Sequence, residues 1–347
     1  MERKSQFPHA PDRVVLWAIY PTIDEAGPEV DSLKDLEDWA ASLMLSIQPV
    51  YAMSPASSQP HSVAAAAAQS YLRRIGATRF LPPVILDLTS NAPLDRIQEL
   101  DRLAAEVGSP CIAVFSHGRS GLPRWVMGSF SETLLLHSRY PVLFLSHARA
   151  PAVAASQVGQ VLFATDFSDL SWQAFLHFTH ITEGGPVEIT LFHSVCLPNS
   201  VLDSNLAGAV VIPANYLPSQ MAWAEQESNR WIERARAQGL TVRLTLSEDG
   251  IGPDVVERIL HAAESAGAQL IVMASNHGAI KSFFAGSVAT GVFRASRYPV
   301  WIYGPCALKD QRADRSTTTH SHENPAAPRE NDQSLRLEPV SEHQNPL

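Results

Sequence analysis

The sequence from Cys111 to Ser146 reads CIAVFSHGRSGLPRWVMGSFSETLLLHSRYPVLFLS, and the interpretation of the whole chain depends on it. An apolar run leads into a glycine-containing loop, and a second apolar run, Val142–Leu145, closes the stretch. Ser129 is followed three residues later by Glu132, which is the spacing of a capping box and predicts a helix beginning at Ser129. A glycine loop that leads into a helix N-terminus is a common way to hold phosphate, although the same pattern also occurs in crossovers that bind nothing.

A second copy of this stretch follows later in the chain. Leu270–Tyr303 reads LIVMASNHGAIKSFFAGSVATGVFRASRYPVWIY and repeats the His-Gly, Gly-Ser and Ser-Arg-Tyr-Pro-Val elements in the same order. The distance from Gly-Ser to Ser-Arg-Tyr-Pro-Val is the same in both copies, which chance explains poorly. We therefore interpret the chain as a duplicated domain.

Composition and charge argue against a nucleic-acid-binding, membrane or secreted protein. The chain has 347 residues, of which 45% are hydrophobic, and this is enough for two domains of ordinary size. A formal net charge of −9 argues against a surface for nucleic acid or anionic membranes. The N-terminus lacks the apolar segment of a secretory signal, no apolar run approaches a membrane span in length, and the three cysteines lie far apart. We expect a cytoplasmic protein with neither nucleic acid nor membrane among its partners.

The rest of the sequence predicts an α/β fold. Each predicted strand is a continuous apolar run, such as Val14–Ile19, and apolar residues at helical spacing follow it. This alternation predicts, in each half, a parallel sheet covered by helices on both faces. We expect domains at residues 12–147 and 159–304, a linker at 148–158 and a disordered polar tail at 305–347.

The glycine loops, the Gly-Ser pairs and the duplication together resemble the universal stress protein family in its tandem two-domain form. The resemblance covers residues 12–304 and is strongest at Val161–Phe175, VLFATDFSDLSWQAF. It implies two doubly wound parallel five-stranded sheets of strand order 3-2-1-4-5, the adenine-nucleotide α-hydrolase-like fold. It also implies that ATP-binding members hold the nucleotide between the first and fourth strands, where the strand order reverses.

The nucleotide signature of this family is incomplete in the first half. The signature is a Gly, two residues, a second Gly, nine residues and then Gly-Ser or Gly-Thr, with an Asp after the first strand. The interval from Gly118 to Gly128 fits, but Phe115 replaces the first Gly and Tyr20 stands near the position of the Asp. A phenyl ring obstructs close approach of a ligand to the backbone, and loss of the carboxylate removes a hydroxyl acceptor. The resemblance implies the less favoured binding residues Gly118, Gly128, Ser129 and Phe130.

The second half matches the signature better. Asp166 is present, although Ser275 replaces the first Gly and only seven residues separate Gly278 from Gly286. Because Ser is smaller than Phe, this half obstructs a ligand less. The resemblance implies ATP or another adenine nucleotide as the cofactor, bound by Ala164, Asp166, Ser194, Ser275, Gly278, Gly286, Ser287 and Val288.

Each candidate residue also has a purely structural interpretation. The Gly-Ser pairs can be capped helix starts, and Asp166 can cap the following helix together with Ser168. His117 and His277 occupy the same repeat position, but no nucleophile with a base partner accompanies them, so we predict no catalytic residue and no metal site.

Three functions follow from these alternatives, in order of preference. The first is a non-enzymatic, nucleotide-responsive stress regulator. The second is a ligand-free scaffold for an unidentified protein partner, in which both nucleotide sites have decayed. An ATP hydrolase comes last, because the sequence offers neither a P-loop lysine motif nor an assignable acidic pair for Mg²⁺.

The fifth strand of each half predicts how the halves meet. In a 3-2-1-4-5 sheet this strand lies at the edge, and here both copies, Pro141–Leu145 and Pro299–Tyr303, are apolar and uncharged. An exposed edge of this kind promotes aggregation, so we expect the two strands to pair antiparallel as an intrachain pseudo-dimer, which the resemblance also implies. The alternative is the same pairing between chains in a domain-swapped dimer.

Overall fold

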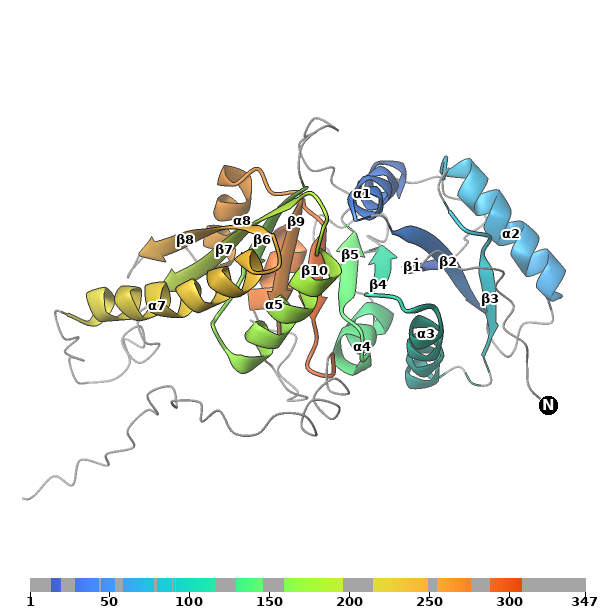
Figure 1. Cartoon of the computed structure of the whole chain (residues 1–347). Helices are drawn as coiled ribbons and strands as arrows, with labels where there is room; N and C mark the ends of the chain where they lie inside the picture. The colour runs from blue at the N-terminus through green and yellow to red at the C-terminus, as the bar shows by residue number, and fades with distance from the viewer. Residues whose placement is uncertain are drawn as a thin grey trace, which may run out of the picture. The chain divides into compact units, whose positions relative to one another are not determined.

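Ten strands form a single sheet in a computed structural model of the chain (Figure 1). The structure describes residues 14–19, 29–43, 45–53, 59–77, 80–88, 90, 92–115, 129–145, 159–195, 215–248, 255–275 and 288–307. Within them the strand order is β3-β2-β1-β4-β5-β10-β9-β6-β7-β8.

The first half contains strands β1 to β5 and helices α1 to α4. Neighbouring strands within it are all parallel. The elements are β1 (Val14–Ile19), α1 (Glu29–Ser42), β2 (Ser46–Met53), α2 (His61–Arg74), β3 (Val84–Asp87), α3 (Pro93–Val107), β4 (Ile112–Phe115), α4 (Ser129–His137) and β5 (Val142–Leu145).

The second half repeats this arrangement with strands β6 to β10, again parallel to their neighbours within the half. Both halves therefore have the strand order 3-2-1-4-5 that the resemblance implies. The elements are β6 (Gly159–Ala164), α5 (Asp169–Ile181), β7 (Val187–Val195), α7 (Tyr216–Arg236), β8 (Thr241–Glu248), α8 (Val255–Ser265), β9 (Leu270–Ala274), α9 (Val288–Ala295) and β10 (Val300–Tyr303).

Local sequence explains where the helices begin and end. The helix expected at Ser129 begins there, as α4. Helix α3 starts with Pro93, whose fixed φ suits a first helical position, and ends at Gly108, whose φ of 64° is readily adopted by glycine. Helix α7 begins at Tyr216, and its Pro218 is tolerated because it lies in the first turn, where no backbone N–H is needed.

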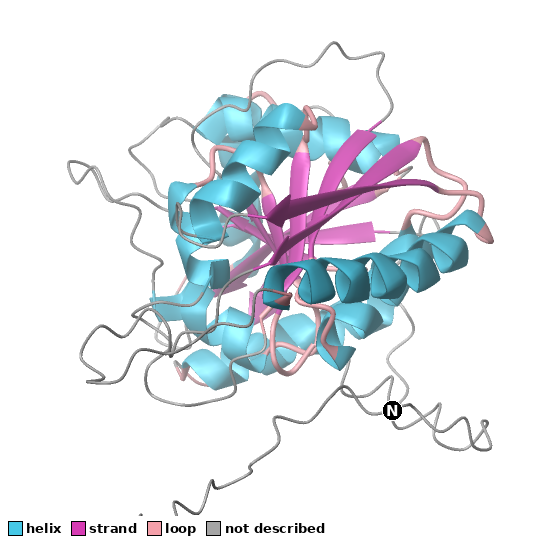
Figure 2. Ribbon diagram, turned by 90° about the vertical axis from the view of Figure 1, so that its left-hand side faces the viewer, coloured by secondary structure: helices cyan, strands magenta, loops and turns pink. Residues whose placement is uncertain are grey.

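Helices cover both faces of the sheet (Figure 2). Two apolar cores result, and each contains residues from both halves. One core includes Trp17 of β1, Trp231 of α7 and Trp301 of β10, all fully buried. Trp223 of α7 is half-buried. No helix in the described part of the chain is long and apolar enough to cross a membrane.

Strands β5 and β10 join the two halves by antiparallel pairing, with Leu143 opposite Trp301 (Figure 1). Both strands are buried along their whole length. Trp301 also packs edge-on against Trp39 of α1, with ring centroids 5.3 Å apart. Side chains from the first half thus complete the packing around the last strand of the second.

A close backbone contact also crosses between the halves, at Gly304. A Cβ atom at Gly304 would overlap the carbonyl oxygen of Leu135 in α4. Since backbone cannot move aside as a flexible side chain can, only glycine fits at this contact.

We therefore predict that Gly304→Ala lowers the free energy of unfolding by about 1–3 kcal/mol, the usual cost of overpacking. Gly159→Ala is the matched control, because the nearest atom to its added methyl group is the Pro186 carbonyl oxygen at 3.6 Å, an ordinary contact. Thermal unfolding of both variants measures the difference. Equal melting temperatures for the two would contradict the contact between the halves.

Candidate functional site

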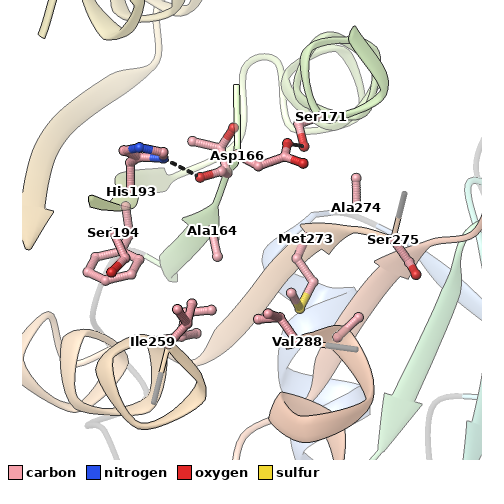
Figure 3. Close-up of a pocket in the computed structure, with 14 residues that line it drawn as sticks. Ala164, Asp166, Ser171, His193, Ser194, Ile259, Met273, Ala274, Ser275 and Val288 are labelled. Carbon is pink, nitrogen blue, oxygen red and sulfur yellow. Dashed lines mark hydrogen bonds between the residues drawn. The ribbon is translucent and has the colours of Figure 1, made fainter. Parts of the chain in front are cut away.

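A cavity of about 190 Å³ opens where β6, β7 and β9 end (Figure 3). It lies between β6 and β9, the first and fourth strands of the second half, where the strand order reverses and ligands of doubly wound sheets usually bind. The described lining residues are Ala164, Thr165, Asp166, Ser171, Phe192, His193, Ser194, Val255, Ile259, Met273, Ala274, Ser275, Val288 and Ala289. Such a lining, apolar with a few polar groups, is typical of small-molecule sites.

Asp166 organises the turn between β6 and α5. Its Oδ1 atom accepts hydrogen bonds from the backbone N–H of Ser168 at 3.0 Å and from the hydroxyl of Ser171 at 2.5 Å. Ser168 is the N-cap of α5, since its hydroxyl oxygen accepts from the backbone N–H of Ser171. The structural interpretation of Asp166 is thus correct in part: it supports the cap but is not the cap itself. It is also exposed and lines the cavity, where a carboxylate can accept from a ligand hydroxyl.

The same turn contains a backbone conformation that L-residues rarely adopt. Phe167 has a φ of 56°, and its backbone N–H donates to the hydroxyl oxygen of Thr165 at 2.9 Å. The Phe167 ring packs against His193, with centroids 4.7 Å apart, and edge-on against Trp223. The aromatic contacts and the Thr165 bond hold the chain in this tight turn, which places Asp166 at the cavity.

His193 of β7 is a lining residue that sequence reasoning missed. Its Nδ1 atom lies 2.8 Å from the backbone carbonyl oxygen of Thr165, and because a carbonyl only accepts, Nδ1 carries the proton. Burial lowers the pKa of His193, while the bond to Thr165 and the nearby Asp166 carboxylate act in the opposite direction. The only signal in the sequence was its place immediately before Ser194 at the end of a strand.

Ser275 lies immediately after β9. Its backbone N–H donates to the carbonyl oxygen of Tyr303 at 2.9 Å, and the residue is 2% exposed. Its Oγ atom has no hydrogen-bond partner among the described residues. A buried hydroxyl on a cavity wall is suited to a polar ligand atom.

The pairing of the strands changes which residue of the second half is aligned with the first glycine of the nucleotide signature. Val142 and Val300 occupy the same place in the repeated Ser-Arg-Tyr-Pro-Val element, and they pair with Ile112 and Ile271 respectively. Counting along the strands then aligns Phe115 with Ala274. It is Ala274, not Ser275, that replaces the first glycine of the signature, and one extra residue precedes His277-Gly278. An alignment that counts backwards from the His-Gly pair selects Ser275 instead, because the extra residue lies between that pair and the end of the strand.

Five of the eight second-half candidates line the cavity, and the other three lie outside the described residues. The lining ones are Ala164, Asp166, Ser194, Ser275 and Val288, and the others are Gly278, Gly286 and Ser287.

The first-half candidates are described only in part. Gly118 and Gly128 lie outside the described residues, as does Tyr20, and Ser129 is the first residue of α4. Phe130 packs under the guanidinium of Arg96 at 5.6 Å.

Phe115 is buried in an apolar core and does not form part of a binding surface. It is 6% exposed and packs edge-on against Trp17, with ring centroids 5.2 Å apart. Within the described residues, no group of three or more His, Cys, Asp or Glu side chains is placed to hold a metal.

The model of the universal stress protein family matches residues 158–304. By this match, the second half of the chain resembles a universal stress protein domain. A curated relative, the universal stress protein YxiE of Bacillus subtilis (strain 168), is 26% identical over 144 residues, which cover 41% of this chain and 97% of the relative.

Solved structures extend the similarity of fold to both halves. A universal stress protein from Archaeoglobus fulgidus DSM 4304 covers 84% of this chain and 98% of its own, with 18% identity and a TM-score of 0.54. A putative universal stress protein from Pseudomonas aeruginosa UCBPP-PA14 covers 88% of this chain and 98% of its own, with 14% identity and a TM-score of 0.52. At these identities the likeness shows the fold.

The buried imidazole predicts a pH dependence of stability. Because the pKa of His193 is lower in the folded state, the unfolded state binds more protons as the pH falls below about 6.5. Acidification from pH 7.5 to 5.5 should therefore lower the melting temperature, and His193→Gln should reduce this loss. His137→Gln, at an exposed histidine of α4, is the matched control. Melting curves that give the two variants the same pH dependence would contradict this role of His193.

Proposed function

We propose that this chain is a non-enzymatic regulator of the universal stress protein type that binds ATP or another adenine nucleotide in its second half. The supporting observation is the cavity between β6 and β9, where the second half combines an exposed carboxylate at Asp166 with a small residue, Ala274, in place of the signature glycine. Alanine obstructs backbone approach far less than phenylalanine does. The cavity is smaller than the roughly 300–1,000 Å³ of pockets that enclose a drug-sized ligand, so the described walls suit a base and part of a ribose.

In this proposal the first half is a permanent partner without a nucleotide. Residues 12–147 and 159–304 are the two domains, and they form an intrachain pseudo-dimer through β5 and β10. The first-half counterpart of Ala274 is Phe115, whose ring is committed to the core around Trp17.

The side chains of the cavity favour binding over catalysis. The hydroxyl of Ser171 donates to Asp166, and the hydroxyl oxygen of Ser194 accepts from Arg258. The protonated Nδ1 of His193 is directed at a backbone carbonyl. None of these hydrogen bonds joins a hydroxyl to the imidazole, which is the usual base of an activated nucleophile.

Thermal unfolding tests binding directly. We predict that millimolar ATP raises the melting temperature of the full-length chain, because a ligand at 100 times its Kd stabilises the folded state by about 2.7 kcal/mol. Purified protein should also release adenine nucleotide on denaturation. An unchanged melting temperature at millimolar ATP together with no co-purified nucleotide would favour the scaffold function.

Substitution at Ala274 tests whether the nucleotide binds in the second half. The side chain of Ala274 points towards the side on which Asp166 and Ser171 lie (Figure 3), so Ala274→Leu should fill that space and weaken ATP binding at least about tenfold. Ala274→Gly restores the signature residue and should retain or improve affinity. In the first half, Gly128→Val should have much less effect. Isothermal titration that finds Gly128→Val more damaging than Ala274→Leu would show that the ligand binds in the other half.

A further inference from the structure

His193 of β7 contacts the chain on both sides of Asp166. Its Nδ1 atom donates to the backbone carbonyl oxygen of Thr165 at 2.8 Å, and its ring packs against the ring of Phe167 with centroids 4.7 Å apart (Figure 3). Thr165 directly precedes Asp166 in the chain, and Phe167 directly follows it. One side chain from a neighbouring strand therefore fixes both neighbours of this carboxylate residue.

The bond to Thr165 extends the ladder between β6 and β7 by one step. Residue pairing between these strands ends at Ala164 and Phe192, and the backbone N–H of Thr165 still donates to the carbonyl oxygen of Phe192 at 2.9 Å. Thr165 is 8% exposed. Since a buried carbonyl without a partner is costly, the imidazole of His193 has a structural reason to stay bonded to it.

The residue that follows Asp166 also depends on this ring. Phe167 has a φ of 56°, a conformation that is costly for a residue with a Cβ atom. Trp223 of α7 packs edge-on against Phe167 at 5.7 Å between centroids and against His193 at 6.2 Å. The three rings stabilise the turn, so side chains from β7 and α7 together determine where the carboxylate of Asp166 lies.

The charged groups around His193 are few among the described residues. The turn between β6 and α5 contributes Asp166, whose carboxylate favours the protonated imidazole. Strand β8 contributes Leu246, which pairs with His193, and α7 contributes an aromatic ring, so neither adds a charge. Arg258 of α8 is bonded to Ser194, whose side chain lies on the opposite face of β7 because side chains alternate along a strand.

The first half has no equivalent of this imidazole. Counting along the paired strands aligns Tyr51 with His193, and Ile19 with Thr165. A phenol lacks the basic ring nitrogen of an imidazole. A titratable ring beside the turn after the first strand is therefore a property of the second half.

Protonation of His193 makes the cavity less suited to a nucleotide. A base and a ribose that enter the cavity displace water from its wall, and an imidazolium loses more hydration free energy than a neutral imidazole does. The imidazolium also attracts the carboxylate of Asp166, which a ligand hydroxyl needs as its acceptor. Both effects favour binding to the neutral form of His193.

We propose that His193 is a positioning residue for Asp166 and that its protonation weakens nucleotide binding in the second half. This inference rests on the proposed nucleotide binding and adds regulation by pH to it. Because binding is reciprocal, bound nucleotide lowers the pKa of His193. As the pH falls below about 6.5, the free protein then takes up more protons than the complex, and the affinity falls.

Isothermal titration of the full-length chain with ATP from pH 7.5 to 5.0 tests this dependence. ATP and other groups of the protein also titrate, so the quantity compared is the ratio of the affinities of the wild type and His193→Asn at each pH. The amide nitrogen of Asn can replace Nδ1 as the donor to Thr165, but it takes up no proton. The ratio should fall about threefold or more on acidification, which corresponds to a pKa that ATP lowers by about one unit.

Two further variants separate positioning from titration. His193→Ala leaves the Thr165 carbonyl without its donor and should lower the affinity at pH 7.5 by about 3–10-fold, whereas His193→Asn should restore most of it. His180→Asn, at an exposed histidine of α5 that pairs with Glu183, is the matched control. Identical pH profiles for His193→Asn and His180→Asn would contradict the inference.

Nuclear magnetic resonance follows the proton on His193 directly. Its imidazole signal is the one that disappears from the spectrum of His193→Asn. The pKa measured from this signal should be lower with saturating ATP than without it. A histidine with a structural role alone would show the same pKa in both states.

Two negative outcomes are distinguishable. If the wild-type chain binds ATP but the ratio of affinities stays constant with pH, or if ATP leaves the pKa of His193 unchanged or raises it, the inference is wrong while the proposed function stands. If the wild-type chain does not bind ATP at pH 7.5, both are wrong.

Discussion

The pairing of β5 with β10 is the constraint on which the rest of the structure depends. Each half ends in a short, uncharged strand with a row of backbone donors and acceptors at its edge, and such an edge promotes aggregation unless it is covered. Antiparallel pairing satisfies both edges at once and merges two five-stranded sheets into one. The helices on each face then pack over a continuous surface, which is why both apolar cores draw residues from the two halves. The overlap that any Cβ atom at Gly304 would make with Leu135 shows how close this packing is.

Within this shared framework the two halves use equivalent positions for different purposes. At the end of the fourth strand, Phe115 is committed to an aromatic cluster with Trp17, whereas Ala274 borders the cavity. At the end of the second strand, the first half has Ala52, and the second half has a serine bonded to a buried arginine. The duplicated fold thus allows one copy to specialise in packing and the other to retain a cavity with a few polar groups.

Much of the fold could be predicted from the sequence, because it depends on periodic and repeated signals. Continuous apolar strands, glycine helix ends and the repeated Ser-Arg-Tyr-Pro-Val element were sufficient for the element order, whereas the strand order in each half came from the family resemblance. The candidate site was predicted less completely. His193 and Arg258 belong to no motif and reach the site only because parallel strands and a helix bring distant segments together. The position of Ala274 was missed because alignment from the His-Gly pair cannot detect an inserted residue, whereas strand pairing can.

Covering one edge strand with another that lies at the far end of the chain has a consequence during synthesis. Strand β10 follows β5 by about 160 residues, so at ribosomal rates of roughly 5–20 residues per second the first half waits on the order of 8–30 s for its cover. During that interval the nascent chain presents the bare apolar edge Val142–Leu145, and neighbouring ribosomes on one messenger hold identical edges close together. The intramolecular partner arrives last but at a high effective concentration, and this favours closure within the chain over association between nascent chains.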